Sequence, residues 1–232
     1  LSHQVERLEV VEISPEVVEA SHFFETENHK ALEDPRTNLI IGDGRSHILL
    51  SRQKYDVIIS EPSNPWIAGV AALFTKEFFE GARSHLAPGG LICQWAHTYT
   101  ISQQDLRAIV ATFTSVFPNG TAWMVNGNDL LMVGSQDGTP QALGNIEAHW
   151  SRGTAAANLA EVAATEPFDV LSLFAGTGRE LQAFAQGIEK AGSDDPAKVA
   201  EVLKDGTAIS TVVGPVTFDA KPGLIASLSV LR

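Results

Sequence analysis

The sequence predicts an α/β fold with a doubly wound, mostly parallel sheet that ends in an antiparallel hairpin. Short apolar segments rich in β-branched residues alternate with helical segments over residues 1–135, an order typical of parallel strands covered on both faces. Two further apolar segments, 122–125 and 130–133, flank the turn residues 126–129 and predict the hairpin.

The first part of the chain predicts two strands, each followed by a helix. Residues 7–13 form the first predicted strand, and Ser14 then caps a helix that has Pro15 at its first position. The second predicted strand, 38–41, runs into Gly42-Asp43-Gly44 and a helix over 45–51. We expect four apolar side chains of the first helix to face a core: Val17, Val18, Phe23 and Phe24.

The stretch 54–74 follows, and the rest of the chain is arranged around it. A strand over 55–59 leads directly into a loop broken by prolines that contains Glu61 and Asn64. Ligands bind beyond the carboxyl ends of parallel strands, where a carboxylate is costly to bury without a partner or a function. We therefore expect Glu61 to face a pocket at this edge.

Later elements are bounded by clear helix signals. Thr75 caps a helix that Pro88-Gly89-Gly90 ends, and a strand over 91–95 follows. Ser102 and Asp105 resemble a capping box and begin a helix that ends at Pro118. Gln94 ends its strand at the same edge as Glu61, and we assign no catalytic role to His97 or Tyr99 just beyond it.

Composition excludes some classes of function. The net charge of −12 argues against binding to nucleic acid and suits small cationic molecules. No segment reaches the apolar length of a membrane span. A single cysteine, Cys93, excludes an internal disulfide and fits the cytoplasm, and the seven histidines have no metal-ligand spacing, so we expect no metal.

Three regions are predicted. Residues 1–135 form the α/β domain, 136–186 a helical tail of that domain, and 187–232 an appended segment. Residues 168–178 (FDVLSLFAGTG) have two interpretations: a nucleotide-binding strand and turn, as in a permuted chain, or an ordinary part of the tail, which we favour.

Four segments in the same order resemble the polyamine aminopropyltransferases (spermidine synthases), most closely the domains fused to membrane transporters. They are 10–20 (VVEISPEVVEA), 34–45 (DPRTNLIIGDGR), 55–79 (YDVIISEPSNPWIAGVAALFTKEFF) and 86–95 (LAPGGLICQW). The resemblance covers residues 5–186 and implies the class I methyltransferase fold. Residues 187–232 instead resemble the C-terminal part of periplasmic binding proteins for branched-chain amino acids.

The resemblance implies transfer of an aminopropyl group from decarboxylated S-adenosylmethionine to a polyamine or related amine. Glu12 would bind the ribose hydroxyls, and Asp43 and Gly44 the adenine. Glu61 stands where the family has its catalytic Asp and would deprotonate the amine, while Asn64 stands where a second Asp is usual. Asn64 and Gln94 would contact the substrate.

The family also implies a homodimer and a cytoplasmic location, alone or as the cytoplasmic domain of a membrane-fused protein. Its glycine-rich nucleotide loop belongs upstream of Val5 and is not in this chain. Two other functions stay open: a methyltransferase that uses S-adenosylmethionine and needs no base at Glu61, and a catalytically silent remnant.

Overall fold

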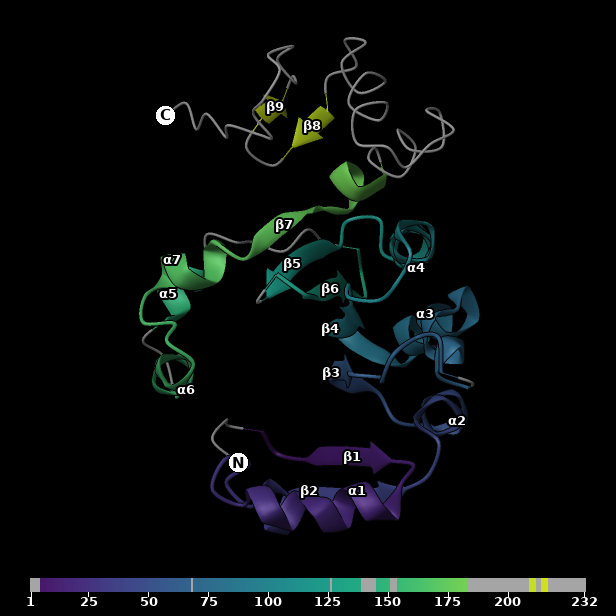
Figure 1. The fold of residues 1–232 in the computed structure, drawn as a ribbon, viewed down its shortest axis with the longest axis vertical. Coiled ribbons are helices and arrows are strands. Elements are labelled where there is room, and N and C mark those ends of the chain that lie inside the picture. Colours follow the sequence, from purple (N-terminus) through teal and green to yellow (C-terminus); the bar gives the residue numbers. More distant parts are fainter. Residues whose placement is uncertain are drawn as a thin grey trace. The chain divides into compact units, whose positions relative to one another are not determined.

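The computed structural model describes residues 5–67, 69–125, 127–138, 145–150 and 154–182, with the backbone of 209–211 and 214–216. The chain forms two compact units. Figure 1 labels their helices and strands. Unit 1 comprises Leu1–Gln53 and Ala142–Leu173, and unit 2 comprises Lys54–Gln141 and Phe174–Arg232. The boundary between Gln53 and Lys54 falls within residues 1–135, which the sequence predicts as one domain. The predicted divisions at 135 and 186 stay predictions.

Unit 1 is built on a pair of parallel strands. β1 (Leu8–Glu12) and β2 (Thr37–Ile41) pair in register, with Glu12 opposite Ile41 at the carboxyl end. Between them lie α1 (Pro15–Ala20), η1 (Ser21–Phe24) and η2 (Ala31–Glu33). The Ser14 hydroxyl accepts a 3.4 Å hydrogen bond from the Val17 amide, which confirms the predicted N-cap.

One expectation for this helix is wrong. Val17, Phe23 and Phe24 are 54%, 85% and 59% exposed, so these three side chains do not enter a core. The chain leaves the α-helical path after six residues and continues as a single 3-10 turn. Because the side-chain spacing differs in a 3-10 turn, the apolar face predicted from α-helical periodicity is not kept.

The other described elements of unit 1 are helices. α2 (Gly44–Leu50) follows β2, and α5 (Asn145–His149), α6 (Ala155–Glu161) and α7 (Pro167–Leu171) lie within the region that the sequence predicts as a helical tail. α7 begins where the Asp169 carboxylate accepts hydrogen bonds from the amides of Thr165 and Glu166, at 2.7 and 3.0 Å. Pro167 at the first helical position supports the same start.

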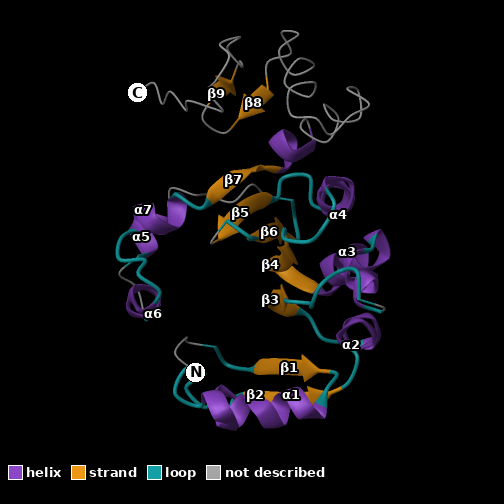
Figure 2. Ribbon diagram, viewed as in Figure 1, coloured by secondary structure: helices purple, strands orange, loops and turns teal. Residues whose placement is uncertain are grey.

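Unit 2 contains a five-stranded sheet in the order β3-β4-β6-β5-β7 (Figure 2). β3 (Tyr55–Ser60) and β4 (Leu86–His97) are parallel, with Ser60 opposite Gln94. β6 (Asp129–Ser135) pairs antiparallel with both β4 and β5 (Thr121–Val125), which confirms the predicted hairpin.

β7 (Phe174–Thr177) pairs antiparallel with β5 at the edge of this sheet. A permuted nucleotide-binding strand at 170–174 would have to be parallel and central. Residues 167–171 are instead helix α7, so the permuted interpretation is wrong. Residues 178–182 are helical, and the Gln182 side chain donates a 3.1 Å hydrogen bond to the Thr114 carbonyl. Both features fit an ordinary tail.

Two helices cover one face of the sheet in unit 2. α3 (Lys76–His85) and α4 (Gln103–Val116) lie on the same side (Figure 2), with η3 (Val70–Phe74) before α3. The capping hydroxyls of Thr75 and Ser102 accept hydrogen bonds from the amides of Phe78 and Asp105, as predicted. The core beneath these helices is apolar and includes Phe79, Ile92, Phe113, Phe117 and Met132.

The opposite face of this sheet is apolar but more open. Val57 and Ile59 of β3 are 55% and 66% exposed, whereas Ile58 between them is 7% exposed. Side chains alternate between faces along a strand, so the β4 residues opposite Val57 and Ile59, Leu91 and Cys93, lie on this open face too. Among the described residues, no helix is long and apolar enough to cross a membrane.

Only parts of the appended segment are described. β8 (Ile209–Thr211) and β9 (Gly214–Val216) form an antiparallel pair. The rest of residues 187–232 lies outside the described residues. The resemblance of 187–232 to binding proteins stays a prediction.

Candidate functional site

In unit 1, Glu12 and Asp43 both lie at the carboxyl end of the parallel pair, Glu12 as the last residue of β1 and Asp43 two residues after β2. The amide of Gly42 donates a 2.9 Å hydrogen bond to the Glu12 carbonyl, which brings the ends of β1 and β2 together. The Glu12 side chain is half-buried, and its Oε1 accepts a 2.8 Å hydrogen bond from the Ser14 amide. Oε2 has no hydrogen bond among the described residues, so a carboxylate oxygen is available at the strand end.

Asp43 is the N-cap of α2. Its Oδ1 accepts from the Arg45 amide at 3.3 Å, and Oδ2 accepts from the amide and hydroxyl of Ser46 at 3.0 and 2.5 Å. The Ser46 hydroxyl contributes most to lowering the pKa of this carboxyl below its usual value, and the two amides add to it. Asp43 is exposed, and a carboxylate oxygen can accept more than one hydrogen bond, so capping leaves room for a further donor.

Gly44 is the first residue of α2, and its backbone does not require glycine. A Cβ atom placed there would meet no heavy atom within 4 Å, and its φ is not positive. The open space over this helix start fits the expected approach of a ligand to the backbone. The ligand itself stays a prediction.

In unit 2, Glu61 directly follows the last residue of β3. The side chain is exposed, so the structure does not bury it in a pocket as we expected. Its charge still acts on the open face of the sheet. Burial raises the pKa of the Cys93 thiol, and the negative charge of Glu61 raises it further.

Gln94 does not share this exposed position. It is 0% exposed and lies on the covered face of β4, between Ile92 and Ala96, which are 0% and 2% exposed. Its Nε2 donates a 3.0 Å hydrogen bond to the Trp95 carbonyl, and its Oε1 has no partner within the part of the chain that the structure describes. Contact with a substrate would require this interior to open, so that role stays a prediction.

Four aromatic rings form a cluster that the sequence did not lead us to expect: two on β4, one just beyond it and one in the loop after β3. Trp95, His97 and Tyr99 are alternate residues, and their successive ring centroids are each 4.8 Å apart. Trp66 meets Tyr99 edge-on at 6.4 Å. Alternate residues of a strand share a face. The spacing of Trp95, His97 and Tyr99 in the sequence could therefore have predicted this cluster. We call these four residues the aromatic wall.

Polar contacts hold two of these rings. His97 lies directly opposite Asp129 of β6, with Nδ1 2.9 Å from Oδ1. The Tyr99 hydroxyl donates a 3.4 Å hydrogen bond to Oδ1 of Asn64 in the loop after β3. Asn64, a predicted substrate ligand, therefore contacts the aromatic wall.

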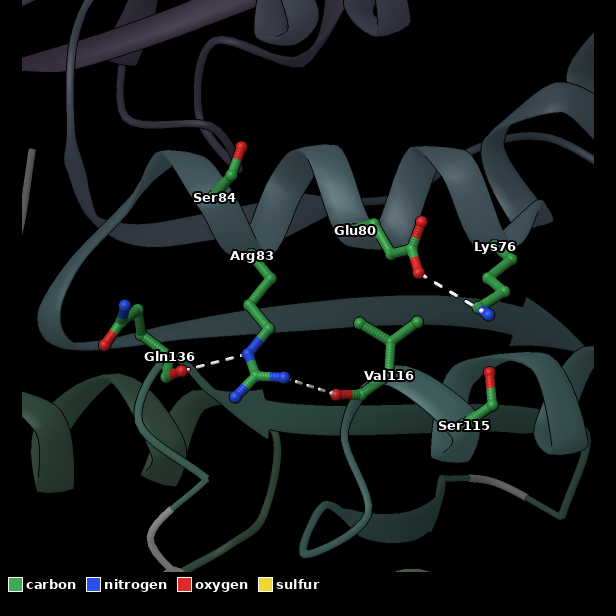
Figure 3. A pocket seen from close by; sticks show the side chains of 7 residues that line it. All are labelled: Lys76, Glu80, Arg83, Ser84, Ser115, Val116 and Gln136. Atoms are coloured by element: carbon green, nitrogen blue, oxygen red, sulfur yellow. Dashed lines mark hydrogen bonds and ion pairs between the residues drawn. The ribbon is translucent and has the colours of Figure 1, made fainter.

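A cavity of about 460 Å³ lies on the helical side of unit 2 (Figure 3). Arg83 at its centre donates from Nε to the Gln136 carbonyl at 3.0 Å and from Nη1 to the Val116 carbonyl at 3.1 Å. Lys76 and Glu80 form an ion pair of 3.6 Å at its side. The Arg83 guanidinium and the Lys76 ammonium therefore both have partners. None of the predicted site residues lines this cavity.

Three possible metal ligands approach one another in unit 1. Ligand atoms of His22, Glu25 and Glu33 lie within 4.8 Å of one another. However, the Lys30 ammonium is 2.8 Å from Glu25 and supplies a positive charge there. Ion pairing of Glu25 with His22 and Lys30 explains this group.

Comparison with known proteins connects these residues to a family. Residues 1–126 match the family model described as "Spermine/spermidine synthase domain". Putrescine N-methyltransferase 2 of Nicotiana tabacum is 32% identical over 122 residues, which cover 51% of this chain and 34% of that protein. Spermidine synthase 2 of Arabidopsis thaliana is 33% identical over 122 residues, which cover 51% and 36%. The matched part thus spans about a third of these curated relatives.

A solved structure has the same fold. The crystal structure of spermidine synthase from Thermotoga maritima superposes with a TM-score of 0.51 and 21% sequence identity, covering 58% of this chain and 47% of that chain. At this identity the likeness concerns the fold alone. It confirms the predicted α/β class.

Proposed function

Because the chain belongs to the spermine/spermidine synthase family, we propose that it transfers an aminopropyl group from decarboxylated S-adenosylmethionine to an amine. The family match over residues 1–126 carries this proposal. Its matched region includes the strand ends that bear Glu12, Asp43 and Glu61.

The residues of unit 1 suit the nucleoside of the donor. The available Glu12 carboxylate oxygen can accept hydrogen bonds from ribose hydroxyls. Asp43 can accept from the amino group of adenine beyond its capping bonds, and the open space at Gly44 lets a flat ring approach the backbone. Each of these roles is supported by chemistry and position at a strand end.

Glu61 of unit 2 suits the acceptor amine. A protonated amine has no lone pair, so Glu61 takes one proton from the ammonium group. The neutral nitrogen then attacks the aminopropyl carbon bonded to sulfur. The C–N bond forms as the C–S bond breaks, the sulfonium sulfur takes the bonding pair, and neutral methylthioadenosine leaves. Asn64 and Gln94 are the proposed acceptor ligands.

A second candidate function is methyl transfer from S-adenosylmethionine to an amine. A relative named putrescine N-methyltransferase, 32% identical over 122 residues, favours it. The two reactions share the nucleoside-binding residues and differ in the group on sulfur. A silent remnant that binds neither donor is the third alternative.

Calorimetric titration of the whole chain separates these alternatives. Binding of methylthioadenosine in preference to S-adenosylmethionine supports aminopropyl transfer, and the reverse preference supports methyl transfer. Binding of neither compound would leave only the silent remnant. Glu12→Gln is the matched variant, since it keeps the shape of the side chain and removes the charge that accepts from two hydroxyls.

We also propose a cytoplasmic location, alone or as the cytoplasmic domain of a membrane-fused protein, and a homodimeric state. The single cysteine fits a reducing compartment. Cell fractionation and size-exclusion chromatography with light scattering test these two proposals.

A further inference from the structure

The cavity on the helical side of unit 2 has a cation at its centre that forms no ion pair with a described carboxylate. Arg83 donates to the carbonyl oxygens of Gln136 and Val116, which carry no formal charge. Its third nitrogen, Nη2, makes no hydrogen bond or ion pair with any residue that the structure describes. Because a guanidinium group has five N–H donors, Arg83 keeps both donors and charge after its two carbonyl bonds are made.

These two carbonyl bonds hold the guanidinium group in place. Val116 is the last residue of α4, and Gln136 directly follows β6, so Arg83 of α3 connects three elements (Figure 3). A side chain that is already held in this way loses little further conformational entropy when a ligand binds. The donors of Nη2 are therefore preorganised.

The other charged side chains of the cavity are a weak ion pair. Lys76 and Glu80 lie one turn apart on α3, 3.6 Å from each other, and their side chains are 58% and 56% exposed. An exposed pair of this kind contributes little, so the Lys76 ammonium can turn to another anion at small cost. With Arg83, the lining has two positive charges and one negative charge, a net charge of +1 in a chain whose net charge is −12.

The size and the donors of the cavity suit a small molecule. Its volume of about 460 Å³ lies within the range of ligand pockets, roughly 300–1,000 Å³. The hydroxyls of Ser84 and Ser115 each donate a 2.7 Å hydrogen bond to a carbonyl of their own helix, so the basic side chains are the main donors for a ligand. Carboxylate and phosphate oxygens are the acceptors that arginine pairs with most strongly.

We propose that this cavity binds a small organic anion, whose carboxylate or phosphate group accepts hydrogen bonds from Nη2 of Arg83 and from the Lys76 ammonium. The anion takes the place of Glu80 as the partner of Lys76. Since none of the predicted site residues lines the cavity, this binding goes beyond the proposed function and does not depend on it.

Calorimetric titration of the whole chain at low ionic strength tests the proposal with three compounds: succinate, inorganic phosphate and succinamide. We expect succinate or phosphate to bind, and the one that binds more tightly identifies the group that the cavity recognises. Succinamide has the carbon chain of succinate without its charge and should not bind. No binding of either anion at concentrations up to about 10 mM, or equal binding of succinamide, would overturn the proposal.

A variant of Glu80 locates the binding without changing Arg83. Glu80→Gln removes the only carboxylate of the lining and releases Lys76, so the anion should bind about 2- to 5-fold more tightly. Glu77→Gln is the matched control, because it removes an exposed carboxylate of the same helix that does not line the cavity. Equal tightening in the two variants would show a general effect of charge and overturn the site.

A variant of Arg83 tests the central donor. Arg83→Gln should weaken binding about 10- to 100-fold, since the anion loses charged hydrogen-bond donors. Thermal unfolding without ligand checks that the variant folds, because it also loses the two carbonyl bonds. Unchanged affinity in the folded variant would overturn the proposal, and if the variant does not fold, the comparison of Glu80→Gln with Glu77→Gln decides. These measurements do not involve methylthioadenosine formation, so failure of the proposed function would leave them unchanged.

Discussion

Glu61 and Cys93 are coupled electrostatically across the β3-β4 pair. Burial raises the pKa of the Cys93 thiol, and the charge of Glu61 raises it further. Cys93 is the chain's only cysteine, so its reactivity reports on the position of the proposed base without any assay of activity.

The first prediction uses this thiol. Glu61→Gln should lower the pKa of Cys93, since it removes a negative charge that disfavours the thiolate. Alkylation by iodoacetamide, followed against pH, should reach its half-maximal rate at lower pH in the variant. Glu80→Gln, which removes a carboxylate on α3, is the control. An unchanged profile in Glu61→Gln would contradict the placement of Glu61 near the open face.

The second prediction separates ligand binding from stability at Gly44. Gly44→Ala should stabilise unit 1 by up to about 1 kcal/mol, because alanine favours the helix and the new Cβ meets no neighbour. The same methyl group should weaken binding of methylthioadenosine. Thermal unfolding and calorimetry measure the two effects. Unchanged binding in a stabilised variant would exclude close approach of the ligand at Gly44.

The third prediction concerns pH. Two side-chain hydrogen bonds from Arg36, at 2.9 and 2.7 Å, hold the pKa of Asp34 well below its usual value. A lowered pKa in the folded state gives stability that is present above the ordinary carboxyl pKa of about 4 and is lost as the pH falls through the folded pKa. Asp34→Asn should therefore lower the unfolding temperature equally at pH 7 and pH 5, and less below pH 4.

Arg36→Gln supplies the control for this pair. It should reproduce the pH profile of Asp34→Asn, and the double variant should lose little more than either single one, because both changes remove the same interaction. Additive losses would show that the two side chains act independently.

The fourth prediction tests the core of unit 2. A Cβ atom at Gly134 would lie 2.5 Å from Cγ of Phe117, a ring that is 2% exposed. Gly134→Ala should destabilise the protein by about 1–3 kcal/mol through overpacking. Adding Phe117→Leu should recover part of this loss. Gly42→Ala, which meets no neighbour, should have little effect on the unfolding free energy.

Local features of this fold follow directly from the sequence. Ser14, Thr75 and Ser102 cap their helices as predicted, because an N-cap depends on a hydrogen bond between neighbouring residues. The hairpin of β5 and β6 was predictable for the same reason, since its turn residues lie between its strands.

Features that depend on distant residues were not predictable. The apolar residues before Gly176 have the composition of a strand. Pro167 and Asp169 nevertheless start helix α7 at this point. The roles of His97 and Tyr99 depend on the β4-β6 register and on the loop after β3, which bring Asp129 and Asn64 to them. A single sequence does not show which distant residues contact one another.

We propose that this chain transfers aminopropyl groups with Glu61 as the base. The most direct measurement incubates the whole chain with decarboxylated S-adenosylmethionine and putrescine and quantifies methylthioadenosine and the extended amine by mass spectrometry. Wild type should form both products in equal amounts, and Glu61→Gln should form them about 100- to 10,000-fold more slowly, the usual contribution of a general base. Equal rates in the two proteins, or no product from wild type, would contradict the account.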